Sequence, residues 1–297
     1  MKSFQYLAPI PAFDYVAPRT LSDLFNLLEG HGKELQVIAG GTDLTIALKE
    51  RVSTPQIVVD LGRLRQELGG IAEEGGILQI GALATFSQIE SSPFVARYAN
   101  ALRQAAANVG TLQIRSIATL GGNLATASPA ADSAPPLIAL GATVTLLSRS
   151  GMRTVPAQGV FTGPKRNGIH HGEIISSVEI PANEEVRSAW TRAAVRNENV
   201  LSTVSVAVAS TISDRRFGPS RVALGAVAPT PMLAENASAA MTGSEATSEQ
   251  AVRVAALAAE DARPISDIRA SAHYRKHLVS VLTRRLILQM ISESMTP

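Results

Sequence analysis

The chain has 297 residues, of which 45% are hydrophobic and 4% aromatic; this is enough aliphatic material for about two folded domains and excludes disorder. Its formal net charge of +2 comes from 27 basic and 25 acidic residues without a run of five like charges, so neither a nucleic-acid partner nor a membrane-surface partner is expected. There is no cysteine, which excludes disulfides, thiolate catalysis and cysteine-ligated clusters within this chain.

The first predicted elements form a compact α/β unit. Thr20 and Asp23 resemble a capping box that opens a helix with one apolar face. An aliphatic strand over residues 35–39 follows, and Thr42-Asp43 is suited to cap a second helix. Residues 57–59 are expected to form another strand, which completes the unit.

The next region mixes strands and helices. Strands are expected over residues 77–82, 143–147 and 174–180, and helices over residues 85–89 and 101–109. The pattern changes again after this region.

Alternating apolar residues then predict a three-stranded antiparallel sheet from residues 190–196, 202–212 and 220–227. Residues 273–290 place leucines on one face and arginines elsewhere, which predicts an amphipathic helix. The fold class is therefore α+β.

These changes of pattern place one domain boundary. We expect a first domain over residues 1–181, with subdomains of about 1–56 and 57–181, and a C-terminal domain over residues 187–290. No stretch of about 18 apolar residues predicts a membrane span, and the N-terminus has no signal-peptide pattern, so a cytoplasmic protein is expected.

Two glycine pairs stand out, in Ala39-Gly40-Gly41-Thr42-Asp43-Leu44 and in Thr119-Leu120-Gly121-Gly122-Asn123. A diglycine turn allows positive φ, lets a ligand approach the backbone, and directs free N–H groups toward a phosphate where a helix begins. Two such turns suit a ligand with two phosphates. A single Gly-Gly pair is nevertheless more typical of a plain tight turn. The dinucleotide and P-loop fingerprints Gly-x-Gly-x-x-Gly and Gly-x-x-x-x-Gly-Lys-Ser/Thr are absent, so a Rossmann or P-loop site is not expected.

At these residues the chain resembles the FAD-binding medium subunits of the xanthine dehydrogenase and carbon monoxide dehydrogenase family. Those subunits carry Ala-Gly-Gly-Thr-Asp-Leu, and later Thr-Ile/Leu-Gly-Gly-Asn before Ser-Pro-x-x-Asp. Further matching stretches are Val109-Gly110 with Gln113-Ile114-Arg115, Gly225 to Pro231, and Tyr274-Arg275-Lys276. The resemblance spans almost the whole chain in the same order.

The resemblance implies a non-Rossmann, PCMH-type FAD-binding domain of two α/β subdomains, followed by the C-terminal domain. It implies roles for particular residues: Ala39, Gly40, Gly41, Thr42, Asp43 and Leu44 would wrap the FAD pyrophosphate, and Thr119, Gly121, Gly122 and Asn123 would oppose them. Ala125 and Thr126 would lie close to the flavin, Asp132 would accept hydrogen bonds from ribose hydroxyls, and Ile175 would contact the flavin ring.

The chain departs from the family pattern at two places. Some relatives have a lysine near the flavin where this chain has Thr191 and Arg192 after Trp190, which leaves the flavin's electrostatics and its electron acceptor open. Relatives often have arginine where Leu233 stands.

The resemblance also implies a function as a relay. Electrons would arrive from [2Fe-2S] clusters on a small iron–sulfur subunit, pass through FAD, and reach NAD+ or another acceptor. A large subunit would hold the molybdopterin cofactor and hydroxylate the substrate, in a heterotrimer or its dimer. Two alternatives remain open: a self-contained flavin-dependent oxidoreductase, and a non-catalytic assembly subunit.

No side chain of this chain is assigned as a catalytic acid, base or nucleophile, because flavin performs the chemistry. His170-His171 and the His273/His277 pair lack the further ligands of a metal site, so none is expected. Ser128 and Ser133 lack a Gly-x-Ser-x-Gly setting. Trp190 is expected in packing or at an interface, with a flavin contact as the alternative.

Overall fold

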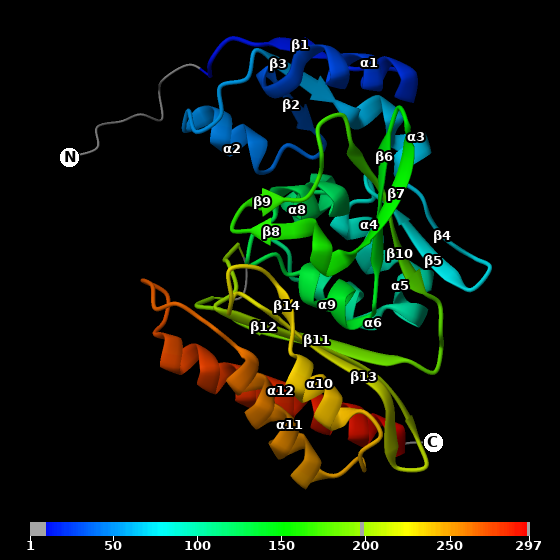
Figure 1. The fold of residues 1–297 in the computed structure, drawn as a ribbon, viewed down its shortest axis with the longest axis vertical. Helices are drawn as coiled ribbons and strands as arrows, with labels where there is room; N and C mark the ends of the chain where they lie inside the picture. The colour runs from blue at the N-terminus through cyan, green and yellow to red at the C-terminus, as the bar shows by residue number, and fades with distance from the viewer. Residues whose placement is uncertain (1–9, 197–198, 296–297) are drawn as a thin grey trace.

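The computed structural model describes residues 10–196 and 199–295, which stack as three bodies from one end of the molecule to the other (Figure 1). The first is the N-terminal α/β unit, the second surrounds a five-stranded sheet, and the third pairs a sheet with long helices. The predicted α+β class is confirmed.

The N-terminal unit is built on a three-stranded parallel sheet in the order β1-β3-β2. Its strands are β1 (Asp14–Val16), β2 (Leu35–Ile38) and β3 (Ile57–Asp60), and its helices are α1 (Leu21–His31) and α2 (Leu44–Lys49). The predicted cap of α1 is present, because the Thr20 side chain accepts a hydrogen bond from the Asp23 N–H at 3.1 Å. The reciprocal capping box occurs at Thr85 and Gln88 instead. Short helical turns η2 (Gly32–Glu34), η3 (Leu61–Leu64) and α3 (Arg65–Leu68) complete the unit.

The central body contains an antiparallel sheet in the order β4-β5-β10-β6-β7. Its strands are β4 (Ile71–Glu74), β5 (Ile77–Gly81), β6 (Thr143–Ser148), β7 (Gly151–Pro156) and β10 (Ile174–Pro181). Its helices are α4 (Phe86–Ser91), α5 (Pro93–Tyr98), α6 (Asn100–Ala106), α7 (Leu112–Ile117), α8 (Leu120–Thr126) and α9 (Ala134–Ala139). A helical turn η4 (Ala157–Val160) leads into the small hairpin of β8 (Phe161–Gly163) and β9 (Arg166–Asn167).

The predicted antiparallel sheet of the third body is confirmed, with strands β11 (Arg187–Ala193), β12 (Val204–Ser213) and β13 (Arg216–Gly225). A two-residue strand, β14 (Met232–Leu233), pairs with β13 as a fourth strand at the edge. Helices α10 (Glu235–Met241), α11 (Ser248–Asp261) and α12 (Ala272–Met295) cover one face of this sheet (Figure 1). The helix predicted over residues 273–290 is confirmed as part of α12, but Arg275, which was expected away from the apolar face, is buried against the sheet.

Arg275 fastens α12 to this sheet. Its guanidinium is 2% exposed, donates to the carbonyls of Thr203 at 2.7 Å and Ala226 at 2.8 Å, and pairs with Asp267 at 2.6 Å. The Asp267 pKa is held well below its ordinary value by hydrogen bonds from Arg269, Arg275 and Ala270, although burial acts in the opposite direction. The family stretch at residues 274–276 therefore has a structural role in this domain.

Within the described residues, no helix is long and apolar enough to cross a membrane.

Candidate functional site

The two glycine segments lie against each other, although about eighty residues separate them along the chain. A Cβ added to Gly40 would stand 2.1 Å from the carbonyl oxygen of Ile117 and 2.9 Å from the Cα of Ala118. The Thr126 hydroxyl lies 3.4 Å from the Asp43 carboxylate. The fold therefore brings together the two segments that the sequence predicted to share one ligand.

The first segment is an open loop. Gly41 has φ +72°, a conformation that side-chain-bearing residues rarely adopt, so the predicted diglycine turn is present here. The main-chain N–H groups of residues 40–44 have no hydrogen-bond partner in the described part of the chain, and the first amide of α2 with one is Thr45, bonded to the Gly41 carbonyl at 3.0 Å. Asp43 stands at the N-cap of α2 but makes no side-chain capping bond, so the expected cap by Thr42-Asp43 is not formed.

These unpartnered amides give the loop its chemistry. Successive N–H groups at the start of a helix present partial positive charge and donors to an anion. Gly40 and Gly41 are partly exposed, so the backbone is accessible from solvent. A side chain at Gly41 would be strained by its φ, and one at Gly40 would collide with the neighbouring backbone. The loop is therefore suited to bind a phosphate group, and its assignment to the FAD pyrophosphate stays a prediction.

The second segment is different from the predicted turn. Gly121 and Gly122 belong to α8, and neither has positive φ. The N–H of Leu120 donates to Ala84 at 3.0 Å, that of Gly121 donates to Ala82 at 2.8 Å, and that of Gly122 donates to the Thr119 hydroxyl at 3.1 Å. The prediction of a second group of free amides is therefore wrong, because the N–H groups at the start of α8 already donate hydrogen bonds within the protein.

Close packing explains the glycine at position 121. An added Cβ would stand 2.7 Å from the Cβ of Ala82 and 2.9 Å from its carbonyl oxygen. Gly121 is buried, and α8 can therefore lie directly on the chain that leaves β5. Polar groups for a ligand come instead from side chains: Asn123 accepts a hydrogen bond from Ser133 at 2.7 Å through Oδ1, and its Nδ2 has no partner in the described residues.

Asp132 lies in a buried polar cluster at the boundary with the C-terminal domain. It is 8% exposed; its Oδ1 accepts from the Ser202 hydroxyl at 2.6 Å, and its Oδ2 pairs with Nη1 of Arg192 at 2.8 Å. Burial raises the pKa of the Asp132 carboxyl above its ordinary value, and Ser202 and Arg192 act against that rise. Its assignment to ribose hydroxyls stays a prediction, while its contacts within the protein join two domains.

Sequence reasoning missed this cluster. Arg192 stands out in the sequence only as a departure from the family pattern, and no local signal marks Ser202, which precedes β12. A pattern along the chain does not report that residues 132, 192 and 202 meet in space.

Ile175 lies in β10, next to a register shift between residues 175 and 177, and is 5% exposed. It belongs to the same apolar cluster as Leu120 and Leu124 of α8, with Ala125 packed against that cluster. The fold thus groups Ile175 with the second segment, and its contact with the flavin ring stays a prediction, as do the cofactor contacts of Thr119, Ala125 and Thr126.

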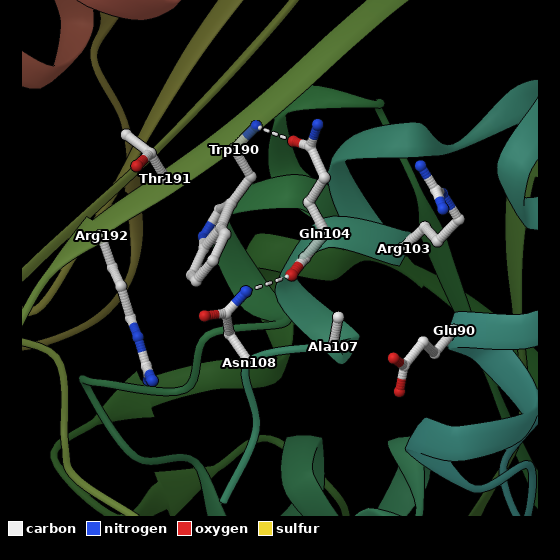
Figure 2. Close-up of a pocket in the computed structure, with 8 residues that line it drawn as sticks. All are labelled: Glu90, Arg103, Gln104, Ala107, Asn108, Trp190, Thr191 and Arg192. Carbon is white, nitrogen blue, oxygen red and sulfur yellow. Dashed lines mark hydrogen bonds between the residues drawn. The ribbon is translucent and has the colours of Figure 1, made fainter. Parts of the chain in front are cut away.

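A cavity of about 410 Å³ lies between α6 and β11 (Figure 2). The Gln104 side chain accepts a hydrogen bond from the main-chain N–H of Trp190 at 2.7 Å, and the Asn108 side chain donates to the main-chain carbonyl of Gln104 at 2.9 Å.

The charged residues that line the cavity have partners within the protein: Glu90 with Arg115, Arg103 with Asn100, and Arg192 with Asp132. Trp190 is 6% exposed, in keeping with the packing role expected from the sequence.

The other residues weighed from the sequence do not assemble a site. The described residues contain no group of three histidine, aspartate or glutamate side chains that could hold a metal. His170 lies near Glu173, whose main partner is Arg153, and His277 stacks with Tyr274 on α12.

Comparison with known proteins agrees with this arrangement. The sequence pattern of the FAD binding domain in molybdopterin dehydrogenase matches residues 11–183, and that of the CO dehydrogenase flavoprotein C-terminal domain matches residues 189–290. The chain is 31% identical over 280 residues to the xanthine dehydrogenase FAD-binding subunit of Escherichia coli O157:H7, covering 94% of this chain and 96% of that one. It is 31% identical over 276 residues to the carbon monoxide dehydrogenase medium chain of Afipia carboxidovorans, covering 93% and 96%.

Solved structures resemble the fold over nearly its full length. The match to quinoline 2-oxidoreductase from Pseudomonas putida 86 has a TM-score of 0.91 at 31% identity, covering 97% of this chain and 100% of that one. The match to carbon monoxide dehydrogenase from Hydrogenophaga pseudoflava has a TM-score of 0.90 at 30% identity, covering 95% and 98%. With the open loop at residues 40–44 and the order of its two domains, this chain belongs to the FAD-binding medium subunits of the molybdenum hydroxylase family of oxidoreductases.

Proposed function

We propose that this chain holds FAD between the loop at residues 39–44 and helix α8, and that it relays electrons within a larger complex. The observation that carries the proposal is the row of main-chain N–H groups at residues 40–44, which have no partner among residues 10–196 and 199–295 and suit a diphosphate. Bound FAD would accept electrons one at a time and release them in pairs to NAD+ or another acceptor.

The protein's part in this function is binding and orientation. The amides of residues 40–44 would hold the pyrophosphate, and the Asn123 amide and Thr126 hydroxyl would face it from α8. Ala125 and Ile175 would supply apolar contacts to the flavin ring. Asp132 would reach ribose hydroxyls only while keeping its bonds to Ser202 and Arg192, which a carboxylate with several lone pairs allows.

The proposed partners come from the family to which this chain belongs. Because the chain has no cysteine, a cysteine-ligated iron–sulfur cluster would lie on a partner, and the family suggests a small subunit with [2Fe-2S] clusters as the source of the electrons. A large subunit would carry the molybdopterin cofactor and the substrate. We further propose a cytoplasmic heterotrimer, or its dimer, and a boundary between the two domains of this chain at residues 181–187.

The self-contained oxidoreductase has less support. It would act alone, whereas the relatives that this chain matches over more than nine-tenths of its length are a FAD-binding subunit and a medium chain of larger enzymes. The assembly subunit without flavin has less support too, because the described part of the protein offers no partner to the amides at residues 40–44.

Three measurements test the proposal. The full chain is mixed with FAD, and binding is followed by quenching of flavin fluorescence; saturable binding is expected, and its absence contradicts FAD binding. The complex purified with its partner subunits is then reduced with dithionite, separated from the remaining dithionite by anaerobic gel filtration and mixed with NAD+, while NADH absorbance is recorded. Flavin that stays reduced with NAD+ but reoxidises with an artificial dye would assign a different acceptor. Turnover of small organic donors by the chain alone would favour the self-contained enzyme.

A further inference from the structure

The β8–β9 hairpin lies against the C-terminal end of α8 (Figure 1). The Asn167 side chain donates from Nδ2 to the Ala125 carbonyl at 2.6 Å. The Lys165 N–H donates to the Ala127 carbonyl at 3.0 Å. A segment about forty residues further along the chain therefore supplies hydrogen bonds to the end of this short helix.

The end of α8 needs such partners. The last carbonyls of a helix receive no hydrogen bond from within the helix, so they require donors from elsewhere. The helix stops at Ala127, which is 1% exposed and has φ 49° and ψ 41°, a left-handed conformation that is unfavourable for a residue other than glycine. Such a backbone persists only when its surroundings hold it.

Asn167 is itself held in one orientation. Its Oδ1 accepts a hydrogen bond from the Ile169 N–H at 3.2 Å, which leaves Nδ2 to face Ala125. The next residue, Gly168, donates to the Val160 carbonyl at 2.9 Å, and its own carbonyl accepts from Arg153 at 2.8 Å. Arg153 belongs to β7, so the hairpin is tied to the central sheet.

The same end of α8 reaches the first glycine loop. Thr126 directly follows Ala125, and its hydroxyl lies 3.4 Å from Asp43 and 2.9 Å from the Gly122 carbonyl. A shift of Ala125 would therefore move the residue that spans the gap between the two segments. Asn167 is thus hydrogen-bonded to a residue of the proposed FAD site but is not itself part of that site.

We propose that Asn167 is a positioning residue: through its bond to Ala125 it sets the end of α8 against bound FAD, with the β8–β9 hairpin as support. The inference rests on the proposed binding of FAD by this chain. It predicts that the hairpin affects the cofactor although it lies outside both glycine segments.

The sharpest variant is Asn167→Asp, which keeps the shape of the side chain and the acceptor for Ile169 but replaces the donor to Ala125 with a carboxylate oxygen. Asn167→Ala removes both bonds and serves as a second variant if the first folds poorly. Asn183→Ala is the matched control, since Asn183 also accepts from a main-chain N–H two residues later, that of Glu185 at 2.9 Å, but lies in the turn after β10.

The experiment uses the full chain and titrates FAD by fluorescence quenching. Both Asn167 variants are expected to raise the Kd for FAD about tenfold, the cost of roughly one hydrogen bond, and to alter the visible absorbance of the bound flavin. The control should match the wild type in both readouts. Circular dichroism of the FAD-free proteins reports whether each variant is folded.

Variants that lower the melting temperature yet keep the wild-type Kd and flavin spectrum would overturn the inference, and FAD binding by the chain would stand. Failure of the wild-type chain itself to bind FAD would overturn both the inference and the proposed function. A folded Asn167 variant with weakened FAD binding beside an unchanged control supports the inference.

Discussion

The two Gly-Gly pairs look alike in the sequence but do different work in the fold. In the first, Gly41 takes positive φ and Gly40 lets the loop approach Ile117, and the amides that follow are left open. In the second, the glycines are helical, their amides bond within the protein, and Gly121 allows α8 to pack on Ala82. The comparison teaches that one motif can mark a ligand-binding backbone in one place and close packing in another.

The two regions also differ in how they are supported. The loop at residues 40–44 contributes few groups to the described hydrogen-bond network, whereas α8 and the residues after it are tied to β5, the β8–β9 hairpin and the C-terminal domain. Changes in the second region should therefore reduce stability, and changes in the first should mainly reduce cofactor affinity.

The largest effect on stability is expected from Arg192→Met. It leaves the Asp132 carboxylate buried without its cation, which costs about 3–5 kcal/mol of unfolding free energy. Urea unfolding of the FAD-free chain measures this loss. The double variant Asp132→Leu with Arg192→Met removes both charges and should recover much of the stability; a double variant as unstable as the single one would show that the pair itself is not the cause.

The largest effect on the cofactor is expected from Gly40→Val. The new side chain meets the backbone at Ile117 and forces the two segments apart, so FAD affinity should fall at least about 100-fold, or roughly 2.7 kcal/mol. Fluorescence titration with FAD measures it. Gly30→Ala in α1 is the control, because an added Cβ there meets nothing within 4 Å, and it should leave FAD binding unchanged. Unaltered FAD affinity in Gly40→Val would contradict the ligand-binding role of the first glycine pair.

A smaller loss is expected from Gly121→Ala. The added methyl group stands too close to Ala82, and overpacking of this kind costs about 1–3 kcal/mol of unfolding free energy. The melting temperature should drop clearly, while the affinity for FAD should change little. If FAD affinity dropped with no change in stability, Gly121 would resemble the first pair rather than differ from it.

The smallest effect on stability at neutral pH is expected from a change at Glu173, which supports the β8–β9 hairpin through Arg153. The bidentate hydrogen bonds from Arg153, at 2.7 Å each, lower the pKa of Glu173 to about 2, with a further bond from the His170 N–H. Because the folded-state pKa lies below the ordinary value of 4.5, this pair contributes stability above about pH 4.5 and loses it as the pH falls toward 2.

Unfolding measured between pH 6 and pH 2.5 tests this, and Glu173→Gln should be less sensitive to acid across that window than the wild type. Equal sensitivity in the two proteins would assign the acid response to other carboxylates. Glu184→Gln is the matched control, because Glu184 pairs with Arg97 on the surface and both side chains are more than half exposed.

The sequence by itself determined the class of fold, the sheet of the C-terminal domain and most of the elements that carry the site. Apolar periodicity reports which residues face a core, and this holds at β10 and along α12, where Leu282, Leu286 and Ile287 are buried. It does not hold at β2, where Val37 is exposed. The sequence also located both glycine pairs and, by resemblance, the family. The six-residue helices α5, α7 and α9 were not predicted, although α2 and α4, which are equally short, were. Six residues make fewer than two helical turns, so apolar periodicity is a weak signal at this length.

Tertiary structure alone decided what the glycine pairs do. Whether Gly121 lies in a turn or in a helix depends on the nearby carbonyls of Ala82 and Ala84, which accept the amides that a free turn would leave open. The contact between Gly40 and Ile117, the meeting of Asp132 with Arg192 and Ser202, and the grip of Asn167 on Ala125 all join residues far apart in the chain. Local propensity does not encode such contacts, because they depend on how whole elements pack.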